Sequence, residues 1–153
     1  MDTGLSQEKL REILDRVMRN VTEKESGILL HQEKDPPRGD LYTVYIVFDK
    51  GFRHSVSMCA EENMFKRIAR HMMQEERVEP QDVEDCAKEY CNVLCGHIAA
   101  ELYRATKVAS RFGLPVFGRG NCQPQNHRKQ FEISYSSDRN EWIQLIHHTY
   151  VPE

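Results

Sequence analysis

A proline-free segment from Pro80 to about Phe112 is the feature that most restricts the fold of this chain. The residues after Pro80 are acidic, which favours a helix beginning there. At about 100° per residue, one side of this helix is apolar: Val83, Ala87, Tyr90, Leu94, Ile98 and Ala105. A long helix with an apolar side needs a larger core to cover it. We therefore predict a helix up to about Phe112, with Pro115 marking its end before a strand.

The other side of the predicted helix carries four residues that we call the polar strip: Asp85, Glu89, Asn92 and Gly96. Their directions differ by no more than roughly 60°. Asparagine has no intrahelical task in mid-helix, and glycine costs about 1 kcal/mol relative to alanine there. Two unfavourable residues on one exposed face indicate a surface that another protein approaches closely. A merely solvated face with a tolerated weak spot is the alternative.

The strip and Pro115 form the pattern Asp-x3-Glu-x2-Asn-x22-Pro, which chance would produce in roughly one chain of this length in a thousand. With the local sequence EYCNVLCGHIAAEL, from Glu89 to Leu102, it resembles the active-site helix of the CheC/CheX/FliY chemotaxis phosphatases. No other asparagine has a glutamate three residues before it. A single copy, without length for a motor-switch domain, is similar to CheX.

The resemblance implies that Glu89 pairs with the lysine of a phosphorylated CheY-like receiver domain and that Asn92 positions the attacking water. An aspartyl phosphate is a reactive acyl phosphate, so orientation is the main catalytic task. Asn92 offers a water both an acceptor and a donor. Gly96 would let the partner approach, and Asp85 would either contact the partner or simply favour the helix start. Magnesium and the phosphoryl group would belong to the receiver, so no cofactor or metal of the chain's own is expected.

Two alternatives to this phosphatase mechanism remain. The same helix face could serve a noncatalytic module that binds receivers or motor components. Cys122 to Arg128, CQPQNHR, has the Cys-x5-Arg spacing of cysteine-dependent phosphatases. Pro124 removes a backbone amide there, and a strand-like rather than a helical pattern follows. We interpret this spacing as accidental.

The remaining cysteines and histidines predict no metal site. Cys86, Cys91 and Cys95 lack the Cys-x2-Cys spacing of a zinc site, and an odd number of thiols suits a reducing compartment. His147 and His148 are adjacent in a strand-like run, so they point to opposite faces and cannot hold one ion together. We expect both to be exposed or partly buried.

The whole chain predicts a single α+β domain, residues 1–153, with the order α-βββ-αα-βββ. An amphipathic helix over residues 5–23, a possible addition to the domain, precedes three strands that form a meander. Two helices and three more strands follow. The expected architecture is a layer of long helices on a largely antiparallel sheet, as in the CheC/CheX fold. The expected strands are residues 27–35, 42–49, 52–58, 114–122, 128–137 and 141–151.

Composition excludes two classes of partner. Charged residues make up 29% of the chain and the net charge is only −3, without a basic face for nucleic acid or an anionic membrane. The polar N-terminus and the lack of a long apolar stretch predict a cytoplasmic protein, and the resemblance implies that it is bacterial.

The resemblance implies a homodimer joined through the sheets, for which the strand from Trp142 to Val151 is the expected edge.

Overall fold

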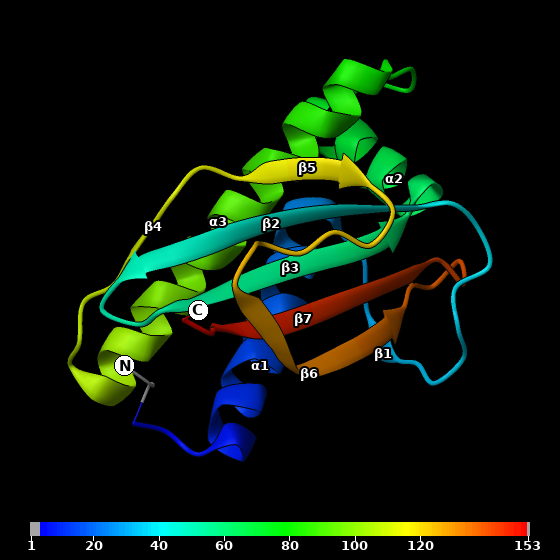
Figure 1. Cartoon of the computed structure of the whole chain (residues 1–153). Coiled ribbons are helices and arrows are strands. Elements are labelled where there is room, and N and C mark those ends of the chain that lie inside the picture. Colours follow the sequence, from blue (N-terminus) through cyan, green and yellow to red (C-terminus); the bar gives the residue numbers. More distant parts are fainter. Residues whose placement is uncertain (1–3, 153) are drawn as a thin grey trace.

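The computed structural model describes residues 4–152, in which three helices lie on one face of an antiparallel sheet (Figure 1). None of the helices in this range is long and apolar enough to cross a membrane. The helices are α1 (Gln7–Ser26), α2 (Glu62–Met73) and α3 (Pro80–Thr106). The strands are β1 (His31–Gln32), β2 (Leu41–Lys50), β3 (His54–Glu61), β4 (Arg111–Phe112), β5 (Val116–Arg119), β6 (His127–Ser136) and β7 (Trp142–Tyr150). The α+β class and the order of the main elements are confirmed.

The strands follow the spatial order β1-β6-β7-β3-β2-β4, and β5 pairs with β2 on the same side as β4. Every pairing is antiparallel. The predicted meander is therefore only partly correct, because β2 and β3 are neighbours whereas β1 lies across the sheet beside β6. Only His31 and Gln32 of the predicted first strand are paired. The free edges within the described chain belong to β5, β4, β1 and the part of β6 that β1 does not reach.

The prediction that Trp142 to Val151 forms a sheet edge is wrong. This segment contains β7, which pairs with β6 on one side and with β3 on the other. Residues Trp142 to His148 are all buried. Strand order depends on pairings between distant segments, which the position of a strand along the chain does not reveal.

The main core lies between the sheet and the three helices. It includes apolar side chains from α1, such as Leu14 and Met18, and from the central strands, such as Val44 and Val56. Helix α3 contributes Val83, Ala87, Tyr90, Leu94 and Ile98, as the apolar stripe predicts. Ala105, the last predicted member, is exposed instead, whereas Leu102 is buried.

Helix α3 ends earlier than predicted. Its last residue is Thr106, and Lys107 takes a left-handed conformation with φ 62° while its N–H donates to the carbonyl of Tyr103. The chain then forms β4, which pairs with the end of β2. Pro115 lies between β4 and β5, so it does not terminate the helix. Proline was a misleading signal here because a left-handed residue other than glycine had already stopped the helix.

The turn between β2 and β3 packs closely against the return segment, which we define as residues 107–110 between α3 and β4. Gly51 has φ +89°, and a Cβ on it would lie 2.4 Å from the carbonyl oxygen of Ala109. A side chain at this position would therefore force the return segment away from the turn. The close contact helps to place β4 against β2 directly after α3.

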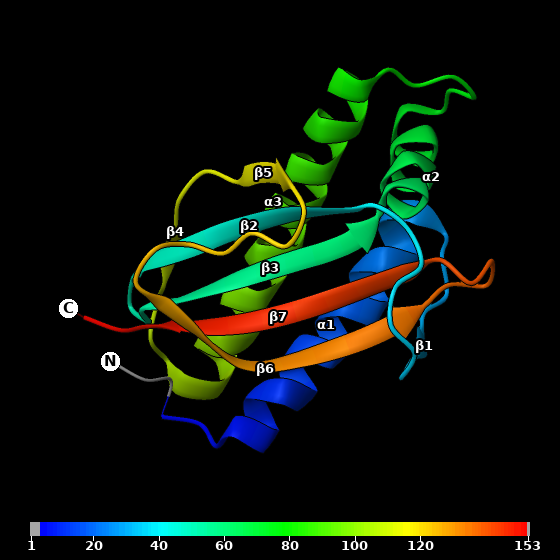
Figure 2. The ribbon, with the colours of Figure 1, turned by 45° about the vertical axis from the view of Figure 1, so that its right-hand side comes forward.

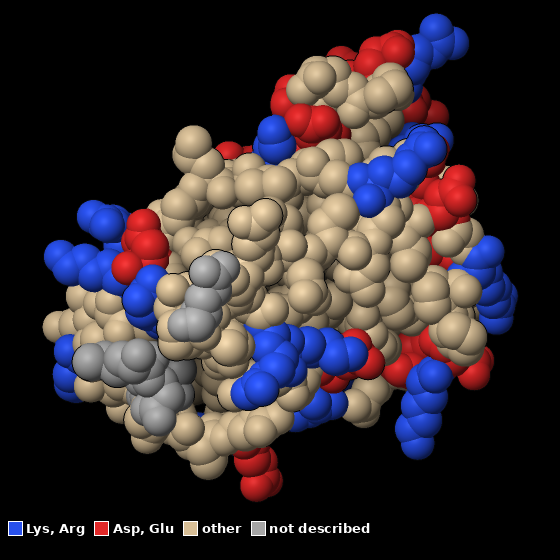
Figure 3. Space-filling model, in the orientation of Figure 1, with Lys and Arg blue, Asp and Glu red and all other residues tan. Residues whose placement is uncertain are grey.

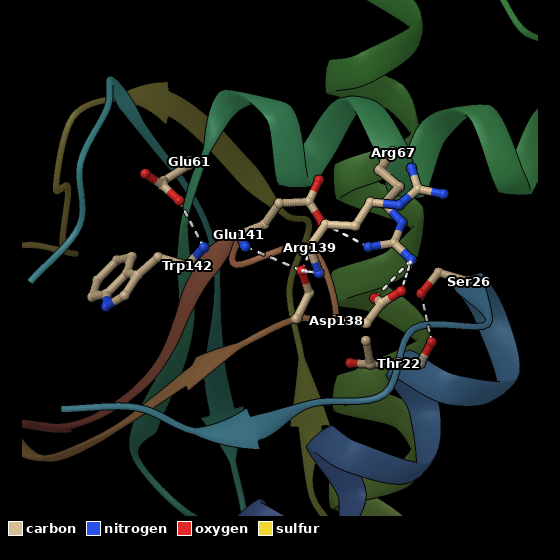
Figure 4. Close-up of polar contacts among 9 residues, drawn as sticks. Thr22, Ser26, Glu61, Arg67, Asp138, Arg139, Glu141 and Trp142 are labelled. Atoms are coloured by element: carbon tan, nitrogen blue, oxygen red, sulfur yellow. Dashed lines mark hydrogen bonds and ion pairs between the residues drawn. The ribbon is translucent and has the colours of Figure 1, made fainter. Parts of the chain in front are cut away.

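An ion-pair network connects α2 to the β6–β7 hairpin (Figure 4). The guanidinium of Arg67 lies 2.7 Å from Glu141 and 2.8 Å from Asp138. Glu61 accepts a hydrogen bond of 2.7 Å from the backbone N–H of Trp142. The Arg67 and Glu141 side chains are only 15% and 13% exposed, so their pairing is better shielded from water than a typical surface salt bridge.

The sheet face opposite the helices is largely uncharged at its centre, with Lys, Arg, Asp and Glu around its rim (Figure 3). A smaller buried cluster on the sheet contains Cys59, Trp142 and Ile146. Figure 2 shows the helices together behind the sheet, with the first turns of α3 extending past the β5 edge, as in Figure 1. The two faces therefore differ, and α3 belongs to the helical one.

Candidate functional site

Helix α3 carries the predicted site and is well defined at both ends. Pro80 occupies its first turn, and the carboxylate of Asp82 accepts a 2.9 Å hydrogen bond from the backbone N–H of Glu79. This arrangement uses an otherwise unpaired donor at the helix start. The predicted acidic helix start is confirmed. The buried stripe fixes the rotation of the helix, and this rotation decides which residues face solvent.

A buried pair of hydroxyl groups fixes α3 against α1 at the level of the strip. The hydroxyl of Tyr90 hydrogen-bonds that of Thr22, and both residues are fully buried. Ser26 donates to the carbonyl oxygen of Thr22 (Figure 4). Burial raises the pKa of Tyr90, so its hydroxyl remains protonated at neutral pH. Tyr90 lies between Glu89 and Asn92 in sequence and points the opposite way, into the core.

The structure places all four residues of the polar strip at the surface of α3. Asp85 accepts a hydrogen bond of 2.9 Å from the side-chain amide of Gln81. Within residues 4–152, the side chains of Glu89 and Asn92 make no hydrogen bond or ion pair. A carboxylate and an amide thus stand on a rigid helix with their hydrogen-bonding capacity available to a partner.

Gly96 has no conformational or packing reason to be glycine. It lies within the regular helix, and an added Cβ would meet no atom within 4 Å apart from its sequence neighbours and the local helix backbone. Glycine in a helix interior costs about 1 kcal/mol relative to alanine. Packing among the described residues therefore does not explain the glycine one turn after Asn92.

The first half of the strip is acidic. Glu84 pairs with Lys88 at 2.9 Å, whereas Glu89 has no such cation among the described residues. Burial raises the pKa of the neighbouring Cys86 thiol, and the nearby carboxylates of Asp82, Asp85 and Glu89 raise it further. A partner that brings an ammonium group to Glu89 would therefore meet a favourable potential.

Comparison with known proteins shows which family the chain belongs to. The family model described as chemotaxis phosphatase CheX matches residues 42–143, about two thirds of the chain. The chain belongs to the CheX family. None of the curated protein sequences matches it. The family match includes the whole polar strip and begins after α1, which lies in the same core as α3.

Solved CheX structures share the fold. The chemotaxis protein CheX from Vibrio vulnificus is 17% identical with a TM-score of 0.71, and the match covers 94% of this chain and 99% of that one. CheX from Desulfovibrio desulfuricans is also 17% identical, with a TM-score of 0.69 and coverages of 91% and 97%. The CheX–CheY–BeF3–Mg2+ complex from Borrelia burgdorferi matches at 12% identity and a TM-score of 0.67, with coverages of 94% and 98%. At these identities the likeness establishes the fold.

The rival motif at Cys122 lacks the geometry of a phosphate-binding loop. Cys122 lies between two strands, its backbone N–H donates to Thr43, and its thiol donates to the carbonyl of Arg119 at 3.2 Å. Arg128 belongs to strand β6. A cysteine phosphatase needs backbone amides aimed at the anion and a helix N-terminus behind them. The CheX-family strip on α3 is therefore the better candidate site.

The histidines are more buried than predicted. His147 and His148 are only 1% and 2% exposed, because β7 is central rather than peripheral. His147 and His54 share a hydrogen bond of 2.8 Å. Burial lowers the pKa of His54 to about 3 and that of His147 to about 4. No group of three or more His, Cys, Asp or Glu residues within 4–152 could hold a metal ion.

Sequence reasoning missed one contact and one exposed residue that bear on the site. The Tyr90–Thr22 contact joins two helices distant in the chain, so no local pattern could reveal it. Tyr103, which is 50% exposed, lies on the same face of α3 as the strip. Its spacing of five full helical turns from Asp85 was the available signal.

Proposed function

We propose that this CheX-family protein hydrolyses the aspartyl phosphate of a CheY-like receiver domain and so terminates a chemotaxis or other two-component signal. The observation that carries the proposal is the pair of exposed side chains, Glu89 and Asn92, which have no hydrogen-bond or ion-pair partner among the described residues and lie beside Gly96 on a rigid helix. The family description as a chemotaxis phosphatase supports it. The complex of a related CheX with CheY, BeF3 and Mg2+ supports the choice of partner, since tetrahedral BeF3 on a carboxylate oxygen resembles a bound phosphoryl group.

In this proposal the two proteins share one catalytic centre. Glu89 accepts a hydrogen bond from the receiver's lysine and so fixes the docking position. The carboxamide of Asn92 hydrogen-bonds a water and holds it in line with the phosphorus–oxygen bond to the aspartate. The water attacks phosphorus, the aspartate carboxylate leaves, and inorganic phosphate forms. The Mg2+ of the receiver neutralises the charge that develops, so the chain needs no metal of its own.

Asp85 and Gly96 take partner-binding roles in the same proposal. Asp85 adds negative charge one turn before Glu89, and its bond to Gln81 restricts its side chain. Gly96 leaves the helix backbone accessible one turn after Asn92. In this way Asp85 attracts a cationic receiver surface, and Gly96 lets that surface come close to the helix.

The decisive experiment is the decay of a phosphorylated CheY-like receiver in magnesium buffer. We expect wild-type protein to accelerate decay and Asn92→Ala to lose roughly a hundredfold in kcat, which corresponds to about 2.7 kcal/mol of transition-state stabilisation. Receiver binding should persist, because Asn92 acts mainly on the water.

Two controls make this loss specific. Asn20→Ala removes an exposed asparagine from the middle of α1 and should leave turnover unchanged. Cys122→Ser should also leave it unchanged, because the thiol lies outside the proposed mechanism. Full activity of Asn92→Ala would exclude the water-positioning role, and loss of activity in Cys122→Ser would favour the cysteine mechanism.

A noncatalytic receiver-binding or motor-associated module is the alternative use of this face. It predicts receiver binding without turnover and without dependence on phosphorylation. The intact Glu89–Asn92 pair argues against it. Receiver affinity measured with and without BeF3 separates the two functions.

We also propose that the protein is a homodimer in the bacterial cytoplasm. Because β7 is internal, pairing between sheets would have to use a free edge, and β5 (Val116–Arg119) is one with half of its residues exposed. Sedimentation equilibrium over a range of concentrations tests the dimer. A monomer at every concentration would contradict it.

A further inference from the structure

The exposed face of α3 continues beyond the polar strip to Tyr103. At about 100° per residue, Tyr103 points within about 20° of Asn92, and the rise between the two residues is about 16 Å. Tyr103 is 50% exposed. Single exposed apolar side chains are common on protein surfaces, so exposure alone says little. Its alignment with the proposed catalytic residues singles Tyr103 out.

The surroundings of Tyr103 are cationic. The ammonium group of Lys107 lies 5.9 Å from the centre of its ring. Arg104 is adjacent, with a side chain 71% exposed, and it pairs with Glu101. The exposed face of α3 is therefore acidic at Asp85 and Glu89 and basic at its other end. A partner lying along the helix would meet opposite charges about 22 to 33 Å apart.

Along the line from Asn92 to Tyr103, the exposed face of α3 carries only small side chains. Gly96 has open space around it, and the alanines that follow, Ala99 and Ala100, carry only methyl groups. A rigid partner seated on Asn92 can therefore reach Tyr103 without meeting a large side chain on this line. The two ends of the face are available to one partner at the same time.

Building on the function proposed above, we propose that Tyr103 and Lys107 form a second contact point for the phosphorylated receiver and determine its affinity. Glu89 and Asn92 alone cover far less than the roughly 800 Å² that each partner buries in a stable interface. Tyrosine is a frequent energetic centre of interfaces, since its ring buries much area with little loss of conformational freedom.

This assignment specifies the chemistry of the partner surface. The receiver carries a lysine next to its phosphorylated aspartate, opposite Glu89. About 16 Å from that aspartate, it carries an apolar patch bordered by acidic side chains, opposite Tyr103 and Lys107. Receivers without such a patch are poorer substrates because they bind weakly, although their chemistry is the same.

Steady-state dephosphorylation of a CheY receiver charged with acetyl phosphate tests the inference. We expect Tyr103→Ala to raise KM about tenfold and to leave kcat within about twofold, since Tyr103 is about 16 Å from the reacting atoms. Tyr103→Phe should retain most of the affinity. Leu29→Ala, which truncates another side chain with 53% exposure outside α3, is the matched control and should change neither constant.

Direct binding to a CheY receiver loaded with Mg2+ and BeF3 separates this inference from the proposed function. If wild-type protein binds the receiver without turnover, the catalytic proposal fails, and a tenfold weaker Kd for Tyr103→Ala still supports the contact. Lys107→Glu should also weaken binding, less so at high salt. Equal Kd and KM for Tyr103→Ala and Leu29→Ala, a fall in kcat alone, or no receiver binding by wild type would each overturn the inference.

Discussion

Individual residues of α3 show how local periodicity and function meet. Asp85, Glu89, Asn92 and Gly96 are exposed together because the apolar stripe on the opposite side fixes the rotation of the helix. Their common direction was predictable from the sequence, since the helical period needs no tertiary information. Gly96 is the most informative of the four, because its effect on the stability of the helix and its effect on partner binding can be measured separately.

Replacing Gly96 with alanine should stabilise the fold and impair partner binding. The helix gains about 0.5 to 1 kcal/mol, because alanine is the better helix former and its methyl group meets open space. Urea unfolding measures the gain, and the KM for phosphorylated receiver measures the effect on docking. The bulkier Gly96→Gln should raise KM further.

Ala105→Gln is the control for these variants at Gly96. Ala105 is an exposed residue of the same helix, about half a turn around from Gly96. Its substitution should leave KM unchanged. Unchanged KM in Gly96→Gln would mean that the partner does not approach the helix at this point.

At the scale of elements, the site depends on contacts that hold α3 against its neighbours. The Tyr90–Thr22 hydroxyl pair connects it to α1, and Gly51 allows the segment after α3 to approach the β2–β3 turn. None of these contacts changes the proposed chemistry directly. They decide whether Glu89 and Asn92 face the partner together.

The Tyr90–Thr22 pair should show strong energetic coupling. Tyr90→Phe leaves the buried Thr22 hydroxyl without this partner, which costs about 1 to 3 kcal/mol. Thr22→Val should cost a similar amount for the same reason. The double variant should be more stable than the sum of both losses predicts, because neither hydroxyl is then left unpaired. A double-mutant cycle by urea unfolding measures this coupling, and strictly additive losses would contradict a direct hydroxyl contact.

At the scale of the whole molecule, the central position of β7 buries an imidazole pair in the sheet. His54 and His147 share a hydrogen bond, and their pKa values are lowered to about 3 and about 4, first by burial. Both remain neutral in the folded state at pH values where an unfolded histidine is protonated. Stability is therefore linked to pH through residues far from the proposed site.

We expect the free energy of unfolding to fall as the pH decreases below about 6.5, the ordinary pKa of histidine. Above this pH the two histidines are neutral in both states and contribute no pH dependence. Between pH 7 and pH 5.5 the loss should be about 1 kcal/mol for each buried histidine, since only the unfolded state takes up the protons. Urea unfolding at several pH values measures it.

Two variants assign this pH dependence. His147→Gln removes one titrating group and should show a shallower fall in stability below pH 6.5. His31→Gln removes an exposed histidine and should keep the slope of the wild type. A stability that stays constant from pH 7 to pH 5.5 would contradict the burial of neutral histidines.

The long helix, its acidic start, its buried stripe and the exposed positions of the polar strip were predictable from the amino-acid sequence. These features depend on a short-range period and on residues next to one another in the chain. Long-range packing sets the end of α3, the central position of β7 and the place of β1 at the edge of the sheet beside β6. It also decides that Tyr90 meets Thr22 and that His54 meets His147. Such contacts join segments distant in sequence, and many pairings of the same strands satisfy the same local pattern, so only the packed molecule selects one of them.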